Sequence, residues 1–249
     1  MWERLDVDET PEATGGALLV ALSTMAPQYR ALYSHARELS RYMLRKKEFK
    51  RFATLYSSSL PPAIAIGDDG IAKLHSNSFY LHAGKRRIVM LAGDGSPFDD
   101  QQQYAHRVLS FAQRLGTTGV VSIGARWADS PLSPSVSPRP VGFASTLEGV
   151  KELESYGVTI TKSEPGPFFP NLVVGMAEGY GMRGYKIGVD HGEPTPHPKS
   201  LVQILRVLSK MLDFEIDIDE LEVRATEIPL VEGVDGLPEV PRERRGIYG

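Results

Sequence analysis

The sequence predicts an α/β protein: a mainly parallel sheet flanked by helices, with an antiparallel β extension. Two observations predict this class. Short apolar runs such as Ala17–Leu22 and Gly119–Gly124 alternate with helical patterns, which is the order that builds parallel sheets. The segment from Phe52 to His82 interrupts that alternation with short β-rich pieces between turn residues, and therefore predicts antiparallel strands or hairpins.

The first predicted unit is a strand followed by a helix. Ala17–Leu22 is a continuous apolar run between glycines and hydroxyl residues, which is typical of a strand buried on both faces. Pro27 then favours the start of a helix. Apolar residues follow at three- and four-residue spacing, namely Tyr29, Leu32, Ala36, Leu39 and Met43. The basic run Arg41–Arg51 is interpreted as the solvated end of this helix.

Regular alternation resumes after the antiparallel segment. Arg87–Ala92 predicts a strand, and a helix follows from about Asp99 to Leu115, before the strand Gly119–Gly124. The next stretch, Ser130–Pro140, is too rich in proline and serine for regular structure. It predicts an exposed loop.

The following elements are shorter. Ser145 and Glu148 have the spacing of a capping box, which predicts a helix to Tyr156. A strand over Val158–Thr161, a loop over Glu164–Pro170 and a small helix over Asn171–Gly181 complete this part.

The last third contains the clearest periodicity. Tyr185–Asp190 predicts a strand, Ser200–Leu212 a helix with one apolar side, and Asp217 the start of a final helix. Beyond Pro229 the apolar periodicity ends and glycine, proline and charged residues dominate. We therefore expect one α/β domain over residues 1–228 and a flexible C-terminal tail over residues 229–249.

Composition limits the classes of function. The 249 residues are 41% hydrophobic and 24% charged, as in an ordinary soluble globular protein. The absence of cysteine excludes disulfides and a cysteine nucleophile. The acidic start, Met1–Pro11, lacks a signal-peptide pattern and no apolar run approaches a membrane span, so we expect a cytoplasmic protein without a membrane partner. The net charge of -3 argues against nucleic acid as a partner.

Three segments of the last third form a recognisable pattern: the strand and turn Tyr185–Pro198, the helix Leu201–Leu212, and Phe214–Leu221 with its Ile-Asp pattern. Together they resemble the archaeal and actinobacterial branch of the proteasome-assembly-chaperone family. The Gly67–Gly70 turn, the strand that ends in Gly93-Asp94-Gly95 and the strand Gly119–Gly124 occur upstream in the order of that family. The resemblance implies a fold similar to purine nucleoside phosphorylases, without their known activity, and a role in building or engaging the proteasome. We expect no cofactor.

The C-terminal residues add a second argument for a proteasome partner. Ile247, Tyr248 and Gly249 match the hydrophobic-tyrosine-any motif with which proteasome activators and some chaperones dock between α-ring subunits of the 20S core. The Gly249 carboxylate can pair with a lysine, while Tyr248 and Ile247 supply apolar contacts. One tripeptide binds weakly, so we expect a homo-oligomer whose several tails act together.

An enzyme that acts on a nucleoside or another small molecule, of phosphorylase or hydrolase type, is the alternative. Asp190, His191, Glu193 and His197 follow a predicted parallel strand, where α/β active sites gather. Gly93-Asp94-Gly95 follows another strand and can bring backbone amides to a phosphate. The histidine spacing matches no zinc-protease motif, and no complete phosphate-binding or nucleophile motif occurs. We therefore predict no catalytic or metal residues.

Overall fold

The computed structural model describes residues 2–26, 31–124, 138–162, 169–190 and 196–227. The strands are β1 (Glu3–Val7), β2 (Ala17–Ala21), β3 (Thr24–Ala26), β4 (Ala31–Tyr33), β5 (Lys50–Ser57), β6 (Ile64–Ile66), β7 (Ala72–Leu74), β8 (Asn77–Ala83), β9 (Arg87–Gly93), β10 (Gly119–Ile123), β11 (Arg139–Ala144), β12 (Thr159–Ile160) and β13 (Arg183–Asp190). The helices are α1 (His35–Lys46), α2 (Gln101–Arg114), α3 (Leu147–Ser155), α4 (Phe169–Met176), the 3-10 helix η2 (Ala177–Tyr180), α5 (Pro198–Leu212) and α6 (Asp219–Glu227). Among these residues, no helix is both long and apolar enough to span a membrane.

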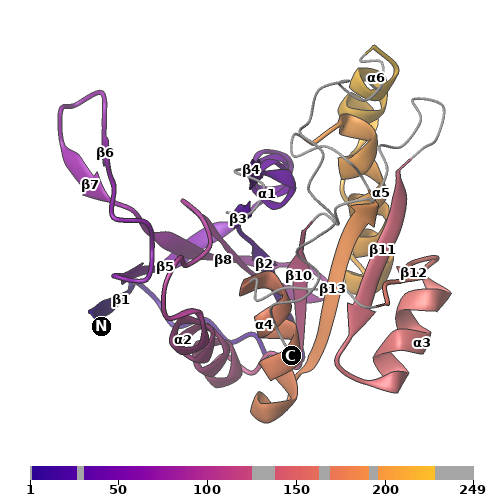
Figure 1. Ribbon diagram of the computed structural model, residues 1–249, viewed down its shortest axis with the longest axis horizontal. Coiled ribbons are helices and arrows are strands. Elements are labelled where there is room, and N and C mark those ends of the chain that lie inside the picture. Colours follow the sequence, from indigo (N-terminus) through magenta and orange to yellow (C-terminus); the bar gives the residue numbers. More distant parts are fainter. Residues whose placement is uncertain (1, 27–30, 125–137, 163–168, 191–195, 228–249) are drawn as a thin grey trace, which may run out of the picture.

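Within those ranges, nine strands form one sheet in the order β1-β5-β8-β9-β2-β10-β13-β11-β12 (Figure 1). The centre, β9-β2-β10-β13, is parallel. On one side β8, β5 and β1 continue the sheet in antiparallel fashion. These pairings confirm the predicted α/β class with an antiparallel extension.

Burial on both faces of the sheet explains why β2 is apolar throughout. In β2, Leu19 packs into one hydrophobic core, while Leu18 and Val20 pack into a second core on the opposite face. Helices α1 and α5 contribute to the first core, and α2 and α4 to the second. Since successive side chains of a strand point to opposite faces, a strand covered on both sides has no position that faces water.

The predicted start of the first helix is wrong. Helix α1 begins at His35, whereas β3 and β4 form a small antiparallel pair in which Met25 lies opposite Leu32. Pro27 and Tyr29 lie outside the described residues. Ala36, Leu39 and Met43 are buried in α1 as expected. Helical spacing upstream of them was coincidental, because strand pairing outweighs a weak local propensity.

The predicted loop over Ser130–Pro140 is wrong at its end. Arg139 and Pro140 are the first residues of β11, which pairs with β13; residues 125–137 lie outside the described part. Strand β12 pairs only with Val141 and Gly142. Proline is tolerated in a strand mainly where no neighbouring strand would accept a hydrogen bond from the N–H that proline lacks. Strand β12 does not pair with Pro140, so no ladder hydrogen bond to β12 is lost there.

Two predicted helix starts need smaller corrections. Thr146, not Ser145, caps α3: its Oγ1 accepts a hydrogen bond from the Gly149 amide at 3.0 Å. The Ser145 hydroxyl accepts instead from the Gly184 amide. The predicted loop over Glu164–Pro170 also ends early, because Pro170 lies in the first turn of α4, a position that suits proline.

Candidate functional site

The predicted docking residues Ile247, Tyr248 and Gly249 lie outside the described residues. The last described element is α6, which ends at Glu227. The site that the structure presents is therefore the attachment of α6, from which the C-terminal residues continue.

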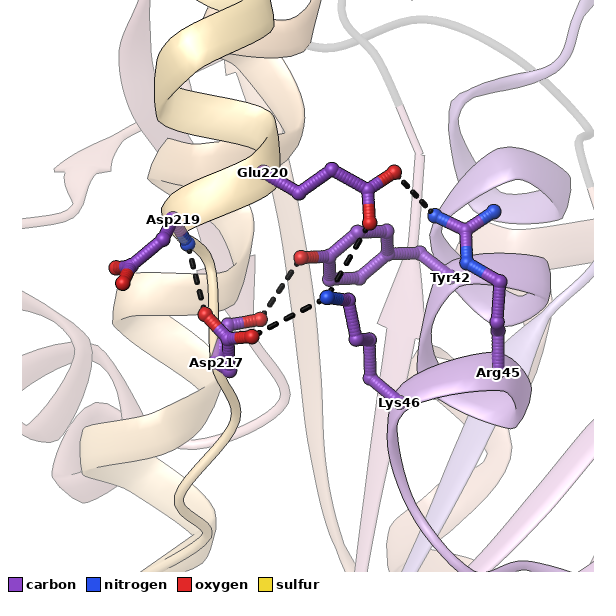
Figure 2. Close-up of polar contacts among 6 residues, drawn as sticks. All are labelled: Tyr42, Arg45, Lys46, Asp217, Asp219 and Glu220. Atoms are coloured by element: carbon purple, nitrogen blue, oxygen red, sulfur yellow. Dashed lines mark hydrogen bonds and ion pairs between the residues drawn. The ribbon is translucent and has the colours of Figure 1, made fainter.

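Helix α1 holds the segment that leads into α6 through a network of polar contacts (Figure 2). The Tyr42 hydroxyl donates to the Asp217 carbonyl oxygen at 2.8 Å. Lys46 Nζ lies 3.2 Å from a carboxylate oxygen of Asp217 and 3.2 Å from one of Glu220. Arg45 contacts the other oxygen of Glu220 at 2.8 Å. The last turns of α1 thus contact both Asp217, two residues before α6, and the first turn of α6.

The charges of this network support one another. The Asp219 amide donates to the Asp217 carboxylate at 2.9 Å, and this bond, together with Lys46, lowers the pKa of Asp217. Hydrogen bonds to Asp217 and Glu220 raise the pKa of Lys46, while burial raises that of Tyr42. All three shifts favour an ion pair beside a neutral phenol. Because Arg45 and Glu220 are about half exposed, water screens each single pair, and the contacts act mainly to orient α6.

Apolar burial supplies the second part of the attachment. Leu221 and Ala225 on one side of α6 are 1% and 7% exposed, and Leu221 belongs to the same core as α1 and α5. An ion pair of 2.7 Å joins Arg206 of α5 to Glu222. Helix α6, the last described element, is therefore fixed on the α1–α5 face.

Sequence reasoning missed this attachment. The basic run Arg41–Arg51 was interpreted as a solvated helix end, but Arg45 and Lys46 contact Asp217 and Glu220. The available signal was charge complementarity between the last turn of one helix and the acidic start of another. That signal is weak because the two segments are more than 170 residues apart, and only the fold brings them together.

The Gly93-Asp94-Gly95 turn proposed for phosphate is fixed to β8. A carboxylate oxygen of Asp94 accepts from the Ser76 amide at 3.0 Å. The buried Asn77 side chain donates to the Gly95 carbonyl at 2.8 Å and to the Tyr104 hydroxyl at 2.8 Å. Gly95 has a φ of 144°, which only glycine adopts readily. These polar groups hold the turn.

The other candidate catalytic residues are only partly described. Asp190 lies 3.5 Å from Arg139 of β11, and His197 caps α5, with its Nδ1 accepting from the Lys199 amide at 3.1 Å. His191 and Glu193 lie outside the described residues. Within the described ranges, no three histidine or acidic side chains gather in a way that could hold a metal ion.

The attachment of α6 predicts a local effect. We expect Tyr42→Phe to lower the stability of α6 docking by about 1 kcal/mol, because the hydroxyl bond to the Asp217 carbonyl is lost without loss of packing. Amide hydrogen exchange in residues 219–227 should rise about fivefold. Tyr180→Phe is the matched control. It removes a surface hydroxyl of η2 that contacts His106 of α2, and it should leave the exchange in residues 219–227 unchanged. Equal exchange in both variants would contradict the role given to Tyr42.

Solved structures share this fold. Pyrococcus furiosus PbaB, described as an archaeal proteasome activator, matches with a TM-score of 0.76 and 20% identity over 90% of this chain and 95% of its own. P. furiosus PbaA, described as an archaeal homologue of proteasome-assembly chaperone, matches with 0.70 and 19% over 91% and 93%. A Mycobacterium tuberculosis proteasome-assembly chaperone homologue matches with 0.68 and 16% over 85% and 91%.

The protein is thus an α/β protein of the PbaB fold whose last described helix, α6, is anchored on α1 and α5. Its sequence matches the model of the PAC2 family over residues 36–232, and the chain belongs to that family. The match runs from the first turn of α1 to beyond α6, so it covers both partners of the polar network. No curated protein sequence matches the chain significantly.

Proposed function

We propose that this protein is a cytoplasmic, non-enzymatic proteasome assembly chaperone or ATP-independent activator. In this proposal a homo-oligomer docks its C-terminal tails into the α-ring of the 20S core, and Ile247, Tyr248 and Gly249 enter the pockets between α-subunits. The observation that carries the proposal is the membership of the PAC2 family together with the hydrophobic-tyrosine-any sequence at residues 247–249. The structural likeness to PbaB, an archaeal proteasome activator, and to PbaA, an archaeal homologue of proteasome-assembly chaperone, supports the same class of partner.

The anchored helix α6 supports this role in physical terms. A docking tripeptide needs a fixed origin and a tether of suitable length. The polar network and Leu221 fix the origin on the α1–α5 face. If residues 229–249 act as a flexible coil, their root-mean-square end-to-end length is about 25 Å and their limit about 70 Å. A tether of this length lets several tails of one oligomer reach adjacent pockets, which raises the effective concentration of each tail.

The described contacts of Asp94 and His197 give the enzyme alternative no added support. Both residues have structural partners, the Ser76 amide for Asp94 and the Lys199 amide for His197. The proposal therefore assigns the proteasome interaction, and not a reaction, to this protein.

Co-sedimentation with purified 20S cores tests the proposal directly. The full chain should pellet with cores, and removal of residues 247–249 should abolish pelleting because each tail loses its carboxylate and both side-chain contacts. The oligomer mass of the truncated chain, measured by light scattering, should be unchanged. Undiminished pelleting of the truncated chain would overturn the docking role.

A further inference from the structure

The β6–β7 hairpin exposes several large aliphatic side chains to solvent. Its residues Ile64, Ile66 and Leu74 are 56%, 70% and 54% exposed. The hairpin projects from the β1–β5–β8 end of the molecule, apart from the helices that cover the large sheet (Figure 1). Isolated two-stranded hairpins are at best marginally stable in water, so a bare apolar face on one calls for a partner.

Strand register places the apolar side chains on a single face of the hairpin. Ile64 lies opposite Leu74, and Ile66 opposite Ala72. Cross-strand partners share a face and alternate residues repeat it, so these four form one uncharged stripe. Ala65 and its partner Lys73 occupy the other face, on which alternation also places the exposed Ile71. The face of Ile64 and Leu74 is thus wholly apolar, while the charge of Lys73 lies on the opposite face; a wholly apolar face is the pattern of an interface core.

An apolar groove lies at the root of this face. It has a volume of about 620 Å³, and its lining includes Trp2, Leu60, Pro61, Pro62, Ile64 and Leu74. Trp2 is 49% exposed, and its backbone nitrogen donates to the Ser58 hydroxyl at 3.0 Å, which holds it beside the groove. Ile64 and Leu74 belong to both groove and stripe, so the hairpin and groove form one continuous surface, here called the arm surface.

We propose that the arm surface binds the arm surface of a second copy of this chain. The chain supplies both a projecting apolar stripe and an apolar groove, which are the two parts that a self-complementary contact exchanges between copies. Trp2, Ile64, Ile66 and Leu74 are each about half exposed or more, and together they expose roughly 500 Å². Complete coverage of these residues in two copies would bury roughly 1,000 Å², the area at which specific interfaces begin. Exposed Pro62 and Ala63 add to this area.

The position of the arm surface suits the proposed function, and the inference rests on that function for its biological role. The hairpin and α6 lie far apart along the longest axis of the molecule (Figure 1). Pairing through the hairpin therefore leaves α6 clear of the interface. Self-association through this surface supplies the multiple tails that docking with avidity requires.

Paired variants on the two faces of β6 test the inference. Ile64→Thr with Ile66→Thr keeps the β-branched strand residues but removes apolar area from the stripe. Ala65→Asp is the matched control, because it places a charge on the same strand but on the face shared with Lys73. Sedimentation velocity over a concentration series should show dimers or larger species for the wild type and the control. The threonine variant should dissociate at least about tenfold more readily, since each contact loses two side chains from both copies.

A second readout does not depend on how the threonine variant folds. The chain contains no cysteine, so Ile66→Cys and Ala65→Cys each introduce a single reporter thiol. Alkylation of the thiol at position 66 should slow as protein concentration rises, while that at position 65 should not. A monomeric wild type, equal alkylation at the two positions, or a control that dissociates as readily as the threonine variant would overturn the inference.

These outcomes are separable from those of the docking proposal. Loss of residues 247–249 should leave the oligomer and the thiol protection intact. If docking fails while position 66 is protected, the self-association stands and the proteasome role falls. If the wild type is a monomer that still pellets with 20S cores, the proteasome interaction stands and self-association through the arm surface falls.

Discussion

Replacement of Tyr248 by alanine should reduce binding to 20S cores by more than about 100-fold. The ring and hydroxyl supply most of the contact of a short docking segment, and loss of such an aromatic anchor costs about 1–3 kcal/mol, or roughly 5- to 140-fold, for each tail. When several tails of one oligomer bind together, the fold-losses of affinity of the individual tails multiply, because each tail contributes to the avidity. Biolayer interferometry with immobilised cores measures the change.

Two further variants separate the parts of the docking contact. Tyr248→Phe retains the ring and should weaken binding less than Tyr248→Ala, because only the hydroxyl contribution of about 1 kcal/mol per tail is lost. Addition of two glycines after Gly249 should weaken binding as much as Tyr248→Ala, because the carboxylate no longer reaches its lysine. Equal affinity of the extended and native chains would rule out a terminal carboxylate contact.

The second large effect is expected at Gly93. Gly93→Ala should lower the free energy of unfolding by about 2–4 kcal/mol, as measured by chemical denaturation. A Cβ there would lie 2.5 Å from the Ser76 carbonyl oxygen and 2.7 Å from the Asn77 Cα, and both are backbone atoms that cannot rotate away. Relief of this overlap requires β8 and β9 to separate, which disturbs the bonds of buried Asn77 to Gly95 and Tyr104.

Gly119→Ala is the matched control for this prediction. Gly119 also lies in a central strand, β10, but a Cβ there would meet nothing nearer than the Arg183 carbonyl oxygen at 3.6 Å, an ordinary contact. We expect it to change stability by less than about 1 kcal/mol. A Gly93→Ala protein as stable as this control would remove the packing reason for the glycine and reopen the phosphate-binding interpretation of the turn.

Some elements followed directly from local pattern. The apolar run Ala17–Leu22 gave β2 because a strand covered on both faces has no solvent-facing position. The one-sided periodicity of Ser200–Leu212 gave α5, whose His197 and Pro198 also mark its start. In both cases a single segment contains the whole signal.

Other elements were invisible or misleading in the sequence. The short edge strand β1 lay in a segment noted only for its acidity, and β11 began inside a predicted Pro/Ser loop. Both depend on pairing with a distant strand, β5 and β13 respectively. The exposed face of the β6–β7 hairpin was also missed, since alternation of apolar residues predicts a buried face and does not say that no element covers it.

The sequence by itself determined the α/β class, the central strands, α2 and α5, because periodicity and continuous apolarity are local properties of the chain. It also supplied the family resemblance and the C-terminal tripeptide. Only the tertiary structure decided that Lys46 and Tyr42 hold the start of α6, that Asn77 fixes the Gly93-Asp94-Gly95 turn, and that Ile64, Ile66, Leu74 and Trp2 form one surface. Each of these features depends on which distant segments of the chain are in contact. Sheet order and helix packing determine those contacts, and local sequence pattern does not.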